Sequence, residues 1–449
     1  MDLLFLSRLQ FALTIAFHYI FPPLSIGLGL ILAVMEGIYL KTKNPVYQQM
    51  ARFWVKIFGL IFAIGVASGI VMEFQFGANW SAYSRYVGDV FGSALASEGI
   101  FAFFLESGFL SILLFGWNKV GPKMHFFATI MVALGAHFSA IWIIVANSWQ
   151  QTPAGHHIVG EGLKARAEIV DFWQMVFNPS TVDRLSHTIM GAWQAGAFLV
   201  LSVSAFYLLK KKHAEFARAS IKIALVIAVF ASLMQLVTGH SSAVTLADTQ
   251  PAKLAAFEAH YSESAPAAMY LFGWVDEKNE KVLSGPKIAG LLSFLVRWDT
   301  DKPLTGLRTF PPDKRPPVNF VFQTYHGMVA IGMILILITL VGLFSWWRES
   351  LFDKKWFLRI LVLSVLGPQI ANQLGWFSAE VGRQPYVVYN HLLTAEGLSK
   401  TVSMSEVVIS LILFGIIYLF LFALFIYMLN EKISHGPSSE DLIIEGHRV

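Results

Sequence analysis

Long apolar runs dominate the pattern of hydrophobic and polar positions along the chain. Nine such segments alternate with polar connections, roughly at residues 11–40, 54–76, 94–117, 123–147, 186–209, 220–239, 319–345, 357–378 and 405–429. About 20 apolar residues in a helix cross the hydrocarbon core of a bilayer. Only helices and closed barrels satisfy their backbone in lipid, and these runs are too long and continuous for barrel strands. The pattern predicts an all-α integral membrane protein, a bundle of about nine transmembrane helices.

The spacing of the nine segments divides the chain into four parts. We predict transmembrane helices one to six over residues 1–239, a long loop over 240–318, helices seven to nine over 319–430 and a tail over 431–449. The first segment lacks a basic leader and carries Pro22 and Pro23 in its middle. It is therefore not expected to be a cleavable signal peptide.

The distribution of Lys and Arg among the connections predicts the orientation. Connections after odd-numbered spans hold fifteen of them, and those after even-numbered spans hold six outside the long loop. Positive residues accumulate on the cytoplasmic side of short loops. We therefore expect the N-terminus and the long loop outside, and the C-terminus inside.

Composition narrows the class of protein further. The 449 residues are 55% hydrophobic and only 14% charged, whereas a soluble domain carries about a quarter charged residues. A net charge of +4 does not indicate nucleic acid as a partner. With no cysteine, disulfides, iron–sulfur clusters and cysteine-attached or thiolate-ligated haem are excluded. No internal repeat is visible in the sequence, which disfavours an inverted-repeat transporter.

Ionisable and sulfur-bearing side chains inside the apolar segments point to a function, because lipid makes them costly. The relevant residues are His18, Glu98, Glu106, His187, Met328 and Glu380. In the predicted orientation all but Glu106 belong to the outer half of their helices, so five helices bring such groups to one depth. Haem iron takes His and Met as axial ligands, and its flat apolar macrocycle fits between helices. The pattern is therefore typical of a haem site.

Taken singly, each of these residues also has an ordinary structural interpretation. A histidine in a helix is often only hydrogen-bonded, a methionine often only packs, and Glu98 and Glu106 fit buried structural carboxylates. His125, His137 and His240 are interpreted as structural. The haem hypothesis therefore depends on the whole set.

Motifs along essentially the whole chain resemble those of subunit I of the cytochrome bd quinol oxidases, which are bacterial terminal oxidases. They are LSRLQFALT (6–14), FHYIFPPL (17–24), FWVKIFGLIFAIGVASGIVMEFQFGANW (53–80), EGIFAFFLES (98–107), LGAHFSAIWI (134–143), LSHT (185–188), QPAKLAAFEA (250–259), MVAIG (328–332) and GWFSAEVGRQP (375–385). Chance similarity between hydrophobic helices would not reproduce the polar positions of all of these motifs. The resemblance implies a multi-pass protein of the bacterial cytoplasmic membrane.

The resemblance implies a low-spin haem b held by His187 and Met328. Arg184 lies one helical turn before His187 and is placed to meet a propionate, although a solvated arginine at the membrane edge fits equally. Many relatives carry an arginine two residues before the methionine, where this chain has His326.

The resemblance also implies two further haems, a high-spin haem b and the oxygen-binding haem d, or a further haem b in its place. Their ligands map onto His18 and Glu380, with Glu98 also facing iron, and Trp376 and Arg383 line the site. Which ligand serves which haem stays open. Taken without the resemblance, Glu380 fits a solvated loop residue.

A proton relay toward the oxygen site is expected at Glu98 and Glu106. Eight residues separate them, about 12 Å along an ideal helix and 80° around it. Glu106 lies deeper, and with Ser107 and Ser139 it is placed to pass protons from the inside toward Glu98. Oxygen reduction with such uptake is electrogenic.

The long loop resembles the family's quinol-binding loop in its short form. Lys253 and Glu258 match the lysine and glutamate implicated there, and a carboxylate base suits a quinol that must lose protons. Without the resemblance, an amphipathic surface helix with solvated side chains fits this stretch. Ubiquinol and menaquinol both stay open. The family implies a second membrane subunit and a very small third one.

Two other functions fit intramembrane ionisable residues. A di-haem cytochrome b would pass quinol electrons elsewhere, but it normally uses His–His pairs that the spacing here does not supply. A membrane transporter would use the carboxylates without any haem. An absorption spectrum separates all three.

Overall fold

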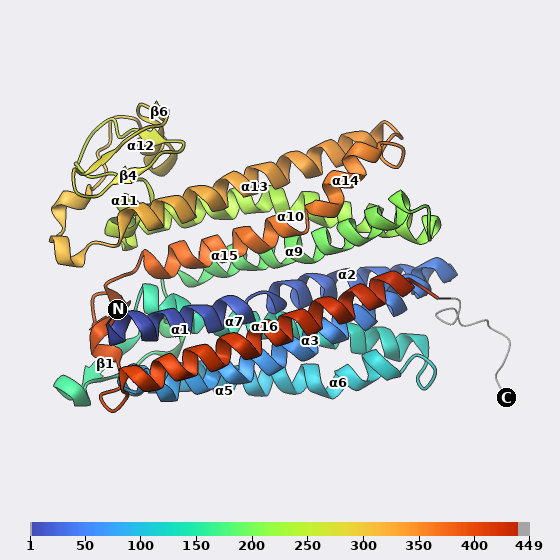
Figure 1. Ribbon diagram of the computed structural model, residues 1–449, viewed down its shortest axis with the longest axis horizontal. Coiled ribbons are helices and arrows are strands. Elements are labelled where there is room, and N and C mark those ends of the chain that lie inside the picture. The colour runs from blue at the N-terminus through green and yellow to red at the C-terminus, as the bar shows by residue number, and fades with distance from the viewer. Residues whose placement is uncertain (1, 439–449) are drawn as a thin grey trace.

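The structure is a computed structural model and describes residues 2–438. Long helices lie side by side along its longest axis (Figure 1). Within the described residues nine helical spans are long and apolar enough to cross a membrane: Leu3–Thr42, Pro45–Ala78, Gly88–Phe115, Pro122–Gln151, Thr181–Leu209, Ala214–Thr249, Pro312–Trp347, Lys355–Val381 and Met404–His435. The prediction of an all-α membrane bundle of about nine spans is confirmed.

The spans consist of thirteen helical elements, because three of them are interrupted. Their bounds are α1 Leu3–His18, α2 Phe21–Thr42, α3 Pro45–Ala78, α5 Gly88–Glu98, the π-helix η1 Gly99–Phe103, α6 Phe104–Phe115, α7 Pro122–Gln151, α9 Thr181–Leu209, α10 Ala214–Thr249, α13 Val318–Trp347, α14 Lys355–Leu363, α15 Leu366–Val381 and α16 Met404–His435. The first span breaks between α1 and α2 because Pro22 and Pro23 lack the N–H groups that a continuous helix needs. The break between α14 and α15 precedes Pro368 in the same way.

Short elements form the connections. The helices are α4 Ser81–Tyr86, α8 Phe172–Val176, α11 Pro251–Phe257 and α12 Leu291–Arg297, with 3₁₀ turns at Gly162–Lys164, Leu307–Thr309, Pro312–Lys314 and Thr394–Gly397. The strands are β1 His156–Val159, β2 Arg166–Ile169, β3 Met269–Tyr270, β4 Val275–Asp276, β5 Lys281–Val282, β6 Lys287–Ile288, β7 Tyr386–Val388 and β8 Leu392–Leu393. They pair antiparallel as β1 with β2, β3 with β6, β4 with β5 and β7 with β8. None of these small sheets adds a separate core layer.

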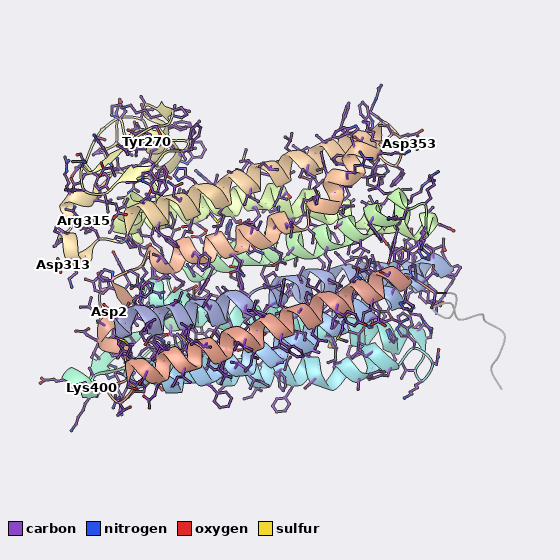
Figure 2. All side chains as sticks on the ribbon, in the orientation of Figure 1. Asp2, Tyr270, Asp313, Arg315, Asp353 and Lys400 are labelled. Atoms are coloured by element: carbon purple, nitrogen blue, oxygen red, sulfur yellow. The ribbon has the colours of Figure 1, made fainter. Side chains whose placement is uncertain are left out.

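The two ends of the bundle differ in what they carry. The N-terminus and the loop elements β3 to β6 and α12 lie at one end, and α16 ends at the other (Figure 1). Asp2, Asp313, Arg315 and Lys400 lie at the first end and Asp353 at the opposite one (Figure 2). This arrangement is the one that nine consecutive crossings require.

Two predicted boundaries differ from the structure. α10 continues to Thr249, about ten residues beyond the predicted start of the long loop, because Ser241 and Thr245 bond to Asp183 on α9 and keep the polar end helical. In the predicted tail, α16 continues to His435, and residues 439–449 lie outside the described residues.

The bundle has two halves joined by one very close helix crossing. Figure 1 shows α9, α10, α13, α14 and α15 in the upper half and α1, α2, α3, α5, α6, α7 and α16 in the lower half. At the crossing of α2 with α9, a Cβ on Gly27 would lie 2.2 Å from the carbonyl oxygen of Ala192. A Cβ on Gly196 would lie 2.4 Å from the carbonyl carbon of Gly27. Only glycine lets two membrane helices approach so closely.

This crossing predicts a large effect of a single methyl group. Gly196→Ala should destabilise the protein by at least about 1–3 kcal/mol, because the new Cβ meets rigid backbone rather than a flexible side chain. The loss should appear even though alanine favours a helix by about 1 kcal/mol over glycine. Thermal unfolding in detergent measures it. Gly415→Ala on α16 is the matched control, since nothing lies within 4 Å of its added Cβ; an equal melting temperature in both variants would contradict the prediction.

Candidate functional site

One large cavity lies between the helices of the two halves. Its volume is about 1520 Å³, which is above the range of about 300–1,000 Å³ of ordinary ligand pockets. All eleven site residues singled out from the sequence line it: His18, Glu98, Glu106, Arg184, His187, Lys253, Glu258, Met328, Trp376, Glu380 and Arg383. The fold therefore brings together side chains from six separate parts of the chain.

His187 on α9 has one ring nitrogen fixed and the other free for a ligand. Its Nδ1 lies 3.0 Å from the hydroxyl oxygen of Thr238 on α10. That hydroxyl donates its own hydrogen to the carbonyl of Met234, at 2.9 Å, so the proton between the two side chains belongs to Nδ1. Nε2 is then the unprotonated nitrogen, and no described residue bonds to it. This is the arrangement in which a histidine binds metal.

His18 on α1 repeats the arrangement at the first span. Its Nδ1 lies 3.0 Å from the hydroxyl oxygen of Ser68 on α3. Ser68 donates to the carbonyls of Ile64 and Gly65, at 2.9 and 3.0 Å, so Nδ1 again carries the hydrogen. The lone pair of Nε2 is therefore available for iron, as it is at His187.

Two histidines that we interpreted as structural have no ring nitrogen available for a ligand. Nδ1 of His125 lies 2.6 Å from Glu36, and its Nε2 bonds to a backbone carbonyl. Nδ1 of His137 donates to a carbonyl of its own helix, and its Nε2 accepts from the indole of Trp193 at 2.9 Å. Both nitrogens of each ring are occupied, which agrees with the structural interpretation. His240 lines the cavity, so its interpretation stays a prediction.

Glycines lie against the side chains of His18, His187 and Met328. A Cβ on Gly69 would lie 3.2 Å from the His18 ring, and one on Gly239 would lie 3.3 Å from the His187 ring. A Cβ on Gly375 would lie 2.7 Å from the sulfur of Met328. These glycines leave room for the two imidazole rings and the thioether themselves, each of which lies directly against the backbone of a neighbouring helix.

Glu380 is only 18% exposed and is held from several directions, so it is not a solvated loop residue. Arg383 donates to its Oε2 at 2.5 Å. Asn147 and Gln151 on α7 donate to its Oε1 at 3.1 and 3.3 Å. Arg184 in turn bonds to Asn147. A carboxylate offers about four acceptor positions, so Glu380 retains one for a further partner.

A π-helix corrects the expected relation between Glu98 and Glu106. The element Gly99–Phe103 lies between them and accommodates one extra residue in its turn. The extra residue changes the angle between the two side chains by about 100°, from the expected 80° to about 20° in the opposite direction. Both side chains therefore lie on roughly one face of the helix. Ser139 donates to Glu98 at 2.5 Å, whereas Gly135 makes room for the side chain of Glu106.

Two residues near this pair differ from expectation. Ser107 is exposed and donates to the carbonyl of Phe103, so it does not face the cavity beside Glu106. Glu73 on α3 lines the cavity and was not identified from the sequence. It lies within the predicted apolar segment 54–76, so the rule used for the other intramembrane carboxylates also applies to it.

The loop helix α11 is buried rather than amphipathic. All residues from Ala252 to Phe257 are buried, and Lys253 and Glu258 are each only 2% exposed. Burial raises the pKa of Glu258 to about 8. Burial and the neighbouring Arg184 and Arg383 lower the pKa of Lys253 well below its usual value. The interpretation of this stretch as a surface helix is wrong.

His326 lies two residues before Met328, where the resemblance leads us to expect an arginine. Its Nδ1 lies 3.0 Å from the carbonyl oxygen of Phe322, and its Nε2 lies 2.9 Å from that of Tyr270 in the loop. Its Nε2 also lies 3.9 Å from Glu258. The side chain therefore ties α13 to the loop next to Met328.

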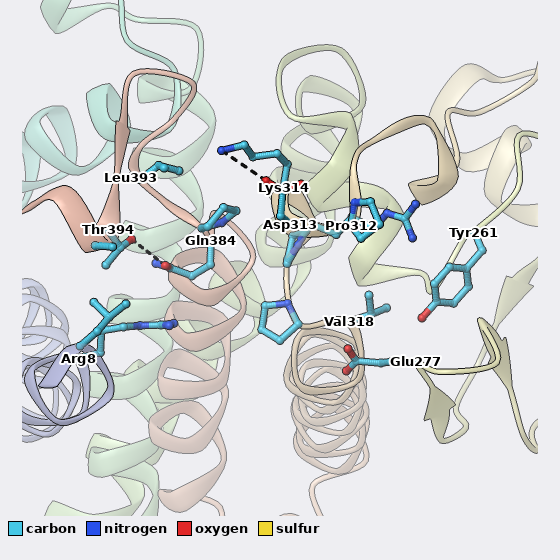
Figure 3. A pocket seen from close by; sticks show the side chains of 16 residues that line it. Arg8, Tyr261, Glu277, Pro312, Asp313, Lys314, Val318, Gln384, Leu393 and Thr394 are labelled. Atoms are coloured by element: carbon cyan, nitrogen blue, oxygen red, sulfur yellow. Dashed lines mark hydrogen bonds and ion pairs between the residues drawn. The ribbon is translucent and has the colours of Figure 1, made fainter. Parts of the chain in front are cut away.

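A second cavity of about 580 Å³ adjoins the first (Figure 3). Arg8, Tyr261 and Glu277 line it from α1 and the loop. Gln384 and Thr394, which bond to each other at 2.7 Å, line both cavities together with Arg8. The two cavities thus share a wall at the same end of the bundle as the loop.

Comparisons with known proteins agree along the whole chain. The family model of cytochrome bd terminal oxidase subunit I matches residues 6–437. Cytochrome bd ubiquinol oxidase subunit 1 of Bacillus subtilis (strain 168) is 40% identical, over 98% of this chain and 96% of its own. Cytochrome bd-II ubiquinol oxidase subunit 1 of Escherichia coli (strain K12) is 35% identical, over 98% of each chain.

Two further matches agree with these. A putative cytochrome bd menaquinol oxidase subunit I of Bacillus subtilis (strain 168) is 33% identical over 98% of this chain and 99% of its own. The solved bd oxidase from Geobacillus thermodenitrificans superimposes with a TM-score of 0.90 and 30% identity, covering 97% of this chain and 99% of that one. The chain belongs to the family of cytochrome bd terminal oxidase subunit I.

Proposed function

We propose that this protein is the haem-bearing subunit of a terminal respiratory oxidase that oxidises membrane quinol and reduces O₂ to water. The observation that carries the proposal is one cavity lined by two histidines with free Nε2 atoms, a methionine, carboxylates and buried cations. The experiment is the absorption spectrum of the purified complex, which should contain haem bands that O₂ oxidises and quinol reduces. A folded preparation without haem would contradict the proposal.

The residues present fit haem groups. His187 and Met328 would hold a low-spin haem b, with Arg184 at a propionate. His18 and Glu380, with Glu98, would serve a high-spin haem b and a haem d or a further haem b, beside Trp376 and Arg383. The fixed Nδ1 atoms of His18 and His187 and the cations around Glu380 support this assignment. Bound haem supplies one-electron transfer and, at an open iron position, a site for O₂.

Glu258 is the candidate base for quinol. A quinol that loses two electrons also loses two protons, and a carboxylate with a pKa near 8 exchanges protons at neutral pH. It is buried beside His326, two residues before Met328 on α13, so proton and electron would leave quinol in one region. The choice between ubiquinol and menaquinol is left to the quinol assay.

Glu106 and Glu98 are the candidate proton relay. Their shared face and the hydrogen bond from Ser139 support transfer from the deeper carboxylate to the shallower one. We place the N-terminus and the long loop outside the bacterial cytoplasmic membrane, following the distribution of Lys and Arg. In that orientation proton uptake from the inside makes oxygen reduction electrogenic. A second membrane subunit and a very small third subunit complete the proposed complex.

Substitution of Met328 separates the low-spin haem from the others. Met328→Leu keeps the side-chain volume, so its packing cost should stay below about 1.5 kcal/mol. The thioether ligand is lost, so the low-spin spectrum should turn high-spin or its potential should shift, while O₂-reactive bands persist. Reduced-minus-oxidised spectra measure this. Met404→Leu, at the exposed start of α16, is the control. If the low-spin spectrum is unchanged in Met328→Leu, Met328 is not a haem ligand and only packs against its neighbours.

The raised pKa of Glu258 predicts the pH dependence of quinol oxidation. A base acts in its deprotonated form, so the quinol-driven rate should rise with pH until about pH 8. Glu258→Gln should lower this rate about tenfold or more and remove the rise, with all haem bands retained. Oxygen consumption with quinol at pH 6 to 9 measures both effects. The exposed loop variant Glu263→Gln should behave as the native protein, and an unchanged pH profile in Glu258→Gln would exclude Glu258 as the base.

A further inference from the structure

Helix α15 presents a row of polar side chains along one face. Gln369 is followed after three, four, seven and eleven residues by Asn372, Gln373, Trp376 and Glu380. On an ideal helix these positions lie within an arc of about 100°. Trp376 and Glu380, in the outer part of the row, belong to the site described above. The inner part consists of three side-chain amides, and the proposed function gives them no role.

The three amides lie where the two halves of the bundle meet. Figure 1 shows α15 at the side of the upper half that faces α1. Nε2 of Gln373 donates to the carbonyl of Ala16 on α1 at 2.8 Å, two residues before His18. On the other side of the row, a Cβ on Gly191 of α9 would lie 2.7 Å from Oδ1 of Asn372. The amides are therefore in contact with both helices that carry a candidate histidine ligand.

Most polar atoms of these amides are buried and bond to no described residue. This is true of both polar atoms of Gln369, of Nδ2 of Asn372 and of Oε1 of Gln373. Gln235 on α10 adds its Oε1 to the set, whereas its Nε2 donates to the carbonyl of His187 at 3.1 Å. Buried polar groups in proteins nearly always have a partner. A ligand is therefore needed that satisfies several donors and acceptors at once.

The chemistry of these atoms indicates water as that ligand. The amides offer N–H donors and carbonyl acceptors without charge, so an ion of either sign would pair with only one kind. The edge of a haem is apolar, and ionised propionates only accept hydrogen bonds. Gln369 also lies one turn further inside than Asn372, which lines the large cavity. Water donates and accepts, and a buried water makes about three hydrogen bonds.

Buried hydroxyls continue the polar groups toward the end of the bundle opposite the loop. Ser202 on α9 donates to the carbonyl of Val362 on α14 at 2.6 Å, beside the break between α14 and α15, where Ser364 is buried. Nearer that end, Ser204 on α9 and Ser220 on α10 are fully buried, and their hydroxyls bond to no described residue. A serine in a helix commonly bonds to the carbonyl one turn earlier. These two hydroxyls are instead placed to bond to water.

We propose that the amides of α15 and Gln235 hold a row of water molecules that carries protons from the inside to the haem cavity, in parallel with Glu106 and Glu98. The inference rests on the proposed function, which consumes protons at the oxygen site and places the C-terminus inside. The amides stay neutral and keep their own hydrogens. One proton enters the row at the serine end and a different proton leaves it at the cavity, so the charge of the row is unchanged.

Gln369→Leu in the full complex tests the proposal, because leucine has nearly the volume of glutamine but neither donates nor accepts a hydrogen bond. The native protein should contain ordered water at Gln369 and Asn372, and the variant should lose it. Proton uptake from the inside during reaction with O₂ should slow by about threefold or more, because water-mediated hydrogen bonds are lost. Haem content, haem spectra and the KM for quinol should stay native. High-resolution electron microscopy and a pH indicator trapped inside vesicles measure the water and the uptake.

Matched variants keep the test decisive. Gln369→Asn keeps the amide and should retain the water and the native rate, and Gln174→Leu, exposed on α8, should change nothing. If Gln369→Leu does not accumulate, Gln369→Met is measured in the same way. Dry amides in the native protein, or native proton uptake in the variant, would overturn the proposal.

The relay gives a second check. Complete loss of proton uptake in Glu106→Gln would also overturn the proposal, because a parallel path leaves a remainder. Absence of haem from the native complex would instead contradict the proposed function, so the two failures are distinguishable.

Discussion

The cost of placing charge inside a low-dielectric bundle is the constraint on which the rest of this structure depends. Carboxylates inside the bundle are held by donors from other helices, as Glu380 is by Asn147 and Gln151 on α7 and as Glu36 is by His125. Each such contact crosses between helices far apart in the chain. The polar groups that carry the chemistry therefore also fix how the helices pack.

Interruptions of regular helix place these groups at the cavity. The proline break between α1 and α2 ends the first helix at His18, and the π-helix brings Glu98 and Glu106 onto one face. Gly69, Gly239 and Gly375 let the side chains of His18, His187 and Met328 lie directly against neighbouring helices. A regular, evenly packed bundle would fill the same volume with apolar side chains. The cavity exists because the sequence departs from regular packing at these positions.

The buried loop helix α11 lies between the contact of Glu258 with His326 and the contact of Lys253 with Gln151. Lys253 and Glu258 are both enclosed, at the two ends of one short helix. Gln151 extends the connection to α7, and His326 extends it to α13. The two halves of the bundle thus meet at the loop as well as at the crossing of Gly27 with Gly196.

The sequence by itself determined the number and approximate positions of the nine spans and the candidate ligands, because hydropathy and the cost of intramembrane charge are local properties. It left undecided which nitrogen of His18 or His187 is free, since Ser68 and Thr238 lie about 50 residues away from them. An ideal helix also gave the wrong phase for Glu98 and Glu106, because the π-turn has no signal in hydropathy. Only the tertiary structure turned Lys253 toward Glu380, since its partners Gln151 and Gly382 come from other spans. Contacts between residues distant in the chain decide these features, and no periodicity within a single segment encodes them.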